Sequence, residues 1–182
     1  MSRLLAVHWV PGLWLDIFNE LLDQDDELDY GDQWRLNFNY TSLTDTLDSA
    51  ERRRGWKIFC SRVYGNFECG SCRKTWPSAR VTVLFHYRLR GERGIVIMRP
   101  LGQSCRRCQD TFELPGFSED VVRGTLQRLF SKIRKNIYDE DDDDDDGGHS
   151  DNSGRGWSKP HESSLCEACK MGICSQNDEC ES

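Results

Sequence analysis

Three pairs of cysteines with the spacing Cys-x-x-Cys constrain this chain more than any other feature of its sequence. The pairs are Cys69–Cys72, Cys105–Cys108 and Cys166–Cys169, and Cys174 and Cys180 follow the third pair. A turn with this spacing points two thiolates at one place, and two such turns complete a tetrahedral Zn²⁺ site. Nine cysteines in a chain without a recognisable signal peptide indicate metal or thiol chemistry rather than structural disulfides. A redox site at Cys69–Cys72 is the main alternative to zinc, but Pro77 does not suit the helix that such a site would need to begin at Cys72.

The residues between the first two pairs predict that these pairs share one zinc ion. Residues 80–89 and 95–101 each have the pattern of a strand, and Arg90–Gly94 between them has the composition of a turn. Such a β-hairpin returns the chain to its starting point. We therefore expect a first zinc site, in the manner of a zinc ribbon with a long insert, made of Cys69, Cys72, Cys105 and Cys108.

The third pair requires partners of its own, and this predicts a second zinc site. Cys166, Cys169, Cys174 and Cys180 could supply four thiolates from one short segment. His86 is the alternative fourth ligand, because it lies on the polar face of its strand where a cysteine-rich tail could reach it. The simpler interpretation is that His86 is an ordinary hydrogen-bonded residue of the sheet.

Apolar periodicity predicts an α+β fold in which helices flank an antiparallel hairpin or sheet. Helices are expected from Pro11, over residues 49–64 and from Ser118, which is a favourable N-cap. Residues 34–40 alternate in the manner of a half-buried strand. Cys60 is expected in the core, on the helical stripe that also carries Trp56, Phe59 and Val63.

Charge divides the chain into three blocks. Residues 50–138 contain 19 Lys/Arg against 7 Asp/Glu, whereas residues 1–49 and 139–182 are strongly acidic. Asp139–Asp146 is a run of eight acids, and a Gly- and Ser-rich stretch follows it to His161. We therefore expect a zinc-binding core over 11–138, a disordered linker over 139–161, and a cysteine-rich segment over 162–182 that completes the domain.

Several functional classes can be set aside. No stretch approaches the roughly 18 consecutive apolar residues of a membrane-spanning helix. We recognise no catalytic constellation, and four thiolates close the coordination shell of a zinc ion, so the chain is not expected to be an enzyme. The basic centre instead suits RNA or an anionic membrane surface, unless its cations pair with the acidic tail of the same chain.

Five segments together resemble the receptor-transporting proteins, which carry a 3CxxC-type zinc-finger domain. These segments are Gly65-Asn-Phe-Glu-Cys-Gly-Ser-Cys72, Trp76-Pro-Ser-Ala-Arg-Val81, Leu84-Phe-His86, Gly102-Gln-Ser-Cys-Arg-Arg-Cys108 and Cys166-Glu-Ala-Cys-Lys-Met-Gly-Ile-Cys174. The resemblance extends from about Trp14 to Cys174, with the acidic linker as a variable insert.

The resemblance implies an accessory protein that binds seven-helix receptors, including odorant and bitter-taste receptors, and promotes their targeting to the cell surface. An interferon-induced member of the family is also implicated in antiviral defence through viral RNA, so an RNA-binding zinc protein is the alternative. The family places such a domain on the cytosolic side of the endoplasmic reticulum or plasma membrane, usually with a C-terminal anchor. The sequence up to Ser182 contains no such anchor, so we expect either that the sequence is incomplete or that this member is soluble or peripheral.

Overall fold

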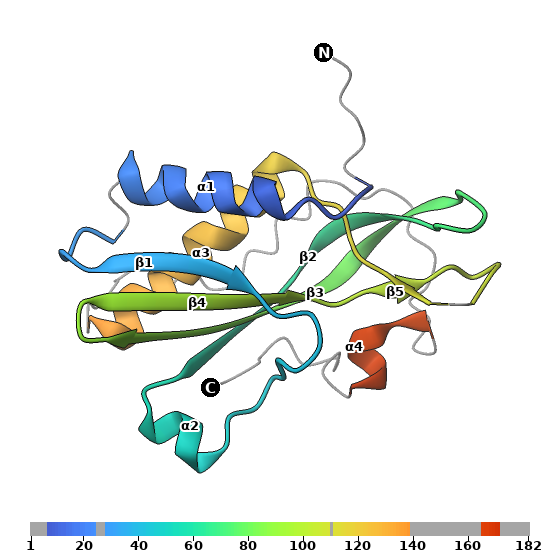
Figure 1. Cartoon of the computed structure of the whole chain (residues 1–182). Helices are drawn as coiled ribbons and strands as arrows, with labels where there is room; N and C mark the ends of the chain where they lie inside the picture. Colours follow the sequence, from blue (N-terminus) through green and yellow to red (C-terminus); the bar gives the residue numbers. More distant parts are fainter. Residues whose placement is uncertain (1–6, 25–27, 110, 139–164, 172–182) are drawn as a thin grey trace.

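The computed structural model describes residues 7–24, 28–109, 111–138 and 165–171, and its centre is a four-stranded mixed sheet (Figure 1). The strands are β1 (Gln33–Phe38), β2 (Lys57–Glu68), β3 (Thr75–Arg90) and β4 (Arg93–Pro100). Their spatial order is β1-β4-β3-β2. β2, β3 and β4 are antiparallel neighbours, whereas β1 runs parallel to β4. The short strands β5 (Gln103–Ser104) and β6 (Phe112–Glu113) form a second sheet, and the α+β prediction is confirmed.

Two long helices cover one face of the sheet, which we call the helical face (Figure 1). They are α1 (Pro11–Asp23) and α3 (Glu119–Ile137). Both were predicted, and their apolar stripes are buried against strand residues such as Phe85 and Tyr87. Ser118 caps α3 by accepting a hydrogen bond from the backbone N–H of Val121, as its sequence position indicated.

The predicted helix over residues 49–64 is wrong beyond its first turn. α2 covers only Ser49–Arg53, and β2 begins at Lys57. Gly55 has a φ of +89°, the left-handed conformation in which a helix commonly ends. The aromatic and β-branched residues that follow favour an extended strand, and pairing with β3 stabilises them there. Cys60 therefore lies on β2 rather than on a helical stripe, and its side chain is half-buried.

The β3–β4 hairpin was predicted, but its connection is shorter than expected. Arg90 pairs with Arg93, so that only Gly91 and Glu92 form the turn instead of the five residues from Arg90 to Gly94. Gly91 has a φ of +62°. A two-residue hairpin turn that matches the strand twist requires such a positive φ, and glycine adopts it without steric cost.

The opposite face of the sheet, which we call the outer face, is also covered. Side chains of paired strand residues share a face, and this face carries three rows across β2, β3 and β4. Leu84 in the central row is fully buried under Leu43 from the segment before α2 and under Cys166 from the C-terminal region. The rows are Ile58, His86 and Ile97; Cys60, Leu84 and Arg99; and Arg62, Thr82 and Leu101.

A short C-terminal segment, residues 165–171, packs on this outer face and contains α4 (Glu167–Lys170). The backbone N–H of Glu167 donates to the carbonyl oxygen of Gly102 at 3.1 Å, and its carboxylate lies 3.4 Å from the guanidinium of Arg99. Cys166 also forms a β-bridge with Gln103. The third cysteine pair is therefore packed against the sheet. The linker expected over 139–161 lies outside the described residues.

Gly94 gives a test of how β1 packs on the sheet. A Cβ atom at Gly94 would overlap the indole ring of Trp34, which lies directly over this residue. We expect Gly94→Ala to destabilise the zinc-loaded protein by about 1–3 kcal/mol, the usual cost of overpacking. Urea denaturation followed by tryptophan fluorescence would measure the change.

Gly124→Ala is the matched control. Gly124 lies inside α3, and apart from the adjoining helix backbone and chain neighbours a methyl group added there would have no atom within 4 Å, so alanine should raise stability by about 0.5–1 kcal/mol. Equal stability of the two variants would contradict the packing of Trp34 on Gly94.

Candidate metal centre

Two turns of the same construction carry the first four cysteines. The turn at Cys69 joins β2 to β3, and the turn at Cys105 follows β5. In each turn the residue after the second cysteine donates its backbone N–H to the carbonyl oxygen of the first, at 3.0 Å for Arg73 and 2.8 Å for Gln109. Both of these residues also have a positive φ, +63° and +48° respectively. Each turn thus directs its two sulfur atoms to one side.

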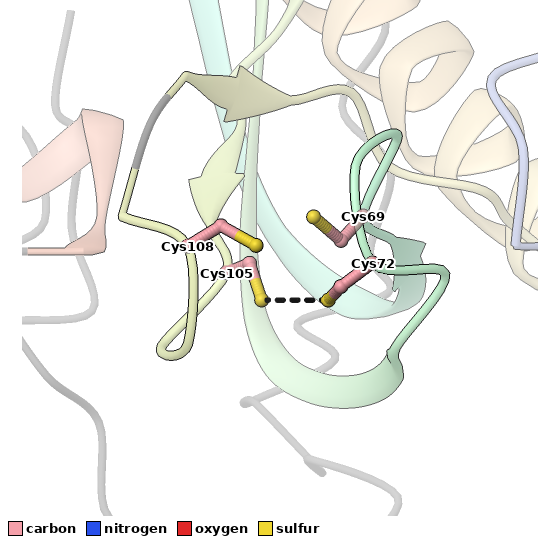
Figure 2. Close-up of side chains that lie close together, drawn as sticks. All are labelled: Cys69, Cys72, Cys105 and Cys108. Carbon is pink, nitrogen blue, oxygen red and sulfur yellow. Dashed lines mark hydrogen bonds between the residues drawn. The ribbon is translucent and has the colours of Figure 1, made fainter.

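The two turns face one another and bring the four sulfur atoms together (Figure 2). The Sγ atoms of Cys69, Cys72, Cys105 and Cys108 all lie within 4.8 Å of one another. Those of Cys72 and Cys105 are 3.7 Å apart although these residues are 33 positions apart in sequence. Four Zn–S bonds of about 2.3 Å in a tetrahedron require sulfur–sulfur distances of about 3.8 Å, so the donor set and its spacing fit zinc.

The pKa values of two thiols in the cluster are shifted in opposite directions. Backbone N–H groups of Cys72 and Ser71 donate to the sulfur of Cys69 and lower the pKa of that thiol from 9.0 to about 7. Hydrogen bonds from Cys108 to the sulfurs of Cys72 and Cys69 raise the pKa of Cys108 to about 12. A divalent cation at this point would favour the deprotonated form of all four cysteines, because it binds them as thiolates.

Neighbouring side chains hold the two turns in place, and sequence reasoning missed them. The side-chain amide of Gln103 donates to Ser78 Oγ at 2.8 Å and accepts from Trp76 Nε1 at 3.1 Å, which ties β5 to β3. Glu113 Oε1 accepts from the backbone N–H of Gly70 at 3.1 Å and so ties β6 to the first turn. The contacts of Gln103 and Glu113 join residues that lie far apart in the sequence. The only indication of them in the sequence was the position of Gln103, two residues before Cys105.

The second predicted group is described only in part. Cys166 and Cys169 are placed on the outer face, whereas Cys174 and Cys180 lie outside the described residues. His86 is buried, with its Nε2 atom 2.6 Å from the carbonyl oxygen of Thr44, and burial lowers its pKa. Across the described parts of the chain, no second set of three or more possible ligand atoms matches the 4.8 Å spacing of the first centre.

Comparison with known families agrees with this geometry. A zinc-binding domain family of the 3CxxC ribbon type matches residues 62–172, which is more than half of the chain. The chain belongs to this 3CxxC zinc-binding family. The matched range includes both turns of the first centre and the third cysteine pair. No solved structure matches the chain.

Relatives of this 3CxxC protein among characterised proteins share about 30% of its residues. Mouse receptor-transporting protein 3 is 31% identical over 172 residues, and human receptor-transporting protein 4 is 31% identical over 180 residues. Mouse receptor-transporting protein 2 is 33% identical over 146 residues. The alignments cover 91%, 90% and 78% of this chain but only 34%, 64% and 62% of the relatives. Within the described residues, no helix is long and apolar enough to cross a membrane.

Loss of one sulfur ligand tests the first centre. We expect Cys105→Ser to lose the zinc ion held there and to unfold the domain. The reason is that structural zinc contributes about 10–16 kcal/mol to folding, which rivals the whole stability of a typical domain. Zinc content and near-UV circular dichroism would report both effects, and a strong chelator should reproduce them in the wild-type protein.

Arg107→Ala is the control, because Arg107 lies between the two cysteines of the same turn and is exposed. This variant should keep its zinc and its spectrum. An unchanged zinc content in Cys105→Ser would contradict the assignment of this residue as a ligand.

Proposed function

We propose that this protein is an accessory chaperone that binds seven-helix receptors, including odorant and taste receptors, and promotes their delivery to the cell surface. The observation that carries the proposal is the family match over residues 62–172, together with relatives that are named receptor-transporting proteins. The chain spans less than two thirds of the length of these relatives, so the activity proposed here is that of the region it shares with them.

The domain organisation that we propose is the one expected from the sequence. The zinc-binding core covers 11–138, the acidic linker 139–161 and the cysteine-rich segment 162–182. The packing of residues 165–171 on the outer face supports including the last segment in the domain. Two zinc ions are proposed, one in the first centre and one held by the third cysteine pair.

The distribution of positive charge supports a docking orientation on a membrane. Several cations of the basic centre are used inside the molecule: Arg99 pairs with Glu167, Arg123 with Glu20, and Arg128 donates to Ser61. The tip formed by Arg52, Arg53 and Arg54 is exposed instead. Figure 1 shows α2 at one end of the sheet and β5 near the other, so this basic tip points away from the zinc centre.

An anionic surface would attract this basic tip. The cytosolic leaflet carries acidic lipids, and each Lys or Arg near it contributes about 1 kcal/mol of attraction. Trp56 follows the tip, and the guanidinium of Arg88 lies over its ring, 4.5 Å from the ring centroid. Trp56 thus adds to the tip an aromatic side chain of the kind found at membrane interfaces. The tip thus has the composition of a peripheral membrane contact beside a receptor.

Co-expression with a panel of seven-helix receptors tests the function. We expect the wild-type chain to raise surface labelling of at least some odorant or taste receptors several-fold relative to total receptor. Cys105→Ser should abolish the increase because the domain unfolds, whereas Arg107→Ala should preserve it. No increase for any receptor, with the wild-type protein folded and zinc-loaded, would refute the proposal.

Neutralising the basic tip tests the orientation. Replacing Arg52, Arg53 and Arg54 by Ala should weaken binding to vesicles that contain phosphatidylserine roughly a hundredfold, as expected from about 1 kcal/mol for each cation. The matched control replaces Arg73, Lys74 and Arg107, three exposed cations in the turns of the zinc centre, by Ala. Equal losses in the two variants would contradict the assignment to the tip. Strong crosslinking of the wild-type protein to RNA, lost in both variants, would favour the RNA-binding alternative.

A further inference from the structure

Cys60 occupies a position that neither the motif pattern nor the family match explains. It lies on β2, outside the three Cys-x-x-Cys pairs and before the matched range that begins at residue 62. Its side chain points to the outer face, in the same row as Leu84 and Arg99. There it packs against the small buried cluster that contains Cys166, and Cys169 packs against the same cluster. Cys60 and the third cysteine pair therefore pack in the same patch of the outer face.

The third cysteine pair has the local geometry of a metal-binding turn. The sulfur of Cys166 accepts the backbone N–H of Cys169 at 3.4 Å, just as the sulfur of Cys69 accepts that of Cys72 in the first centre. The backbone N–H of Lys170 also donates to the carbonyl oxygen of Cys166 at 3.1 Å, which repeats the bond that closes each turn of the first centre. The Cys166 side chain is almost completely buried.

The surroundings contain buried donors that need an acceptor. Thr82 Oγ1 and Arg99 Nε are buried on the same face, and neither has a hydrogen-bond partner among the described residues. Buried donors of this kind are almost always satisfied in native proteins. Metal-bound thiolates are acceptors, and such outer-shell hydrogen bonds commonly orient and stabilise them. A charged thiolate centre on this face would therefore account for both groups.

We infer that Cys60 is a ligand of a second zinc ion, which it shares with Cys166 and Cys169 on the outer face of the sheet. This inference rests on the proposed two-zinc organisation and replaces the purely local set of four C-terminal cysteines. The three sulfurs do not meet the 4.8 Å spacing of the first centre, so zinc binding requires at least one of these side chains to turn about its χ1 bond. The site would join β2 to the C-terminal segment as the first centre joins β2 and β3 to β5.

Zinc content of purified variants tests the inference. The wild-type chain, purified without chelator, should contain about two zinc ions, and Cys60→Val should contain about one. Valine is apolar like the half-buried Cys60 side chain but cannot bind zinc, so a residue that serves only in packing would leave the zinc content unchanged. Ile58→Val is the matched control, because Ile58 is buried on the same strand and face, and it should retain both ions.

Two results would overturn the inference: two zinc ions in Cys60→Val, or only one in the wild-type chain. Neither result bears on receptor delivery, which the co-expression experiment measures separately.

A second measurement uses the wild-type chain and does not depend on whether a variant folds. The zinc-loaded protein is treated with N-ethylmaleimide, and the modified cysteines are mapped by mass spectrometry. Cys60 should be protected together with Cys166 and Cys169, and the three should become reactive together when a chelator removes the zinc. Modification of Cys60 while Cys166 and Cys169 stay protected would overturn the inference.

Discussion

The meeting of four sulfur atoms from two distant turns at the end of the sheet is the central constraint on this structure. The turn at Cys69 and the turn at Cys105 each contain only a few residues, and the first cysteine of each turn is buried. Hydrogen bonds of Gln103 and Glu113 link the segments around the turns, and the four sulfurs lie within 4.8 Å of one another. Zinc at this point would connect the end of β2, the start of β3 and the β5–β6 sheet. A domain of this size gains much of its stability from such a link.

The helical face supplies the other main source of stability. α1 and α3 bury aromatic and aliphatic side chains against β2, β3 and β4, and ring contacts connect Trp14 with Phe85 and Phe117. Arg123 on α3 donates to both carboxylate oxygens of Glu20 on α1 at 3.1 Å, which fixes the two helices side by side. This core contains no cysteine, and it positions the strands whose ends carry the cysteine turns. On the outer face, Arg99 joins the sheet to the C-terminal segment by pairing with Glu167.

Local sequence determined the elements whose signals are short-range. The apolar stripes of α1 and α3, the cap at Ser118 and the alternation in β1 follow from residues a few positions apart, and the structure agrees with each of them. The cysteine spacing, together with a hairpin between the pairs, also predicted that Cys69, Cys72, Cys105 and Cys108 would meet. The helix over 49–64 failed because its periodicity was ambiguous, and pairing with β3 decided between helix and strand.

Only the tertiary structure decided which distant residues share a face. The parallel pairing of β1 with β4, the docking of residues 165–171, and the positions of Gln103 and Glu113 beside the metal centre depend on contacts across many tens of residues. No local pattern encodes such contacts, because their energy appears only when the segments are already assembled. The cysteines illustrate the same difference. The spacing of the pairs could be read from the sequence, whereas the packing of Cys60 against the cluster that contains Cys166 required the folded sheet.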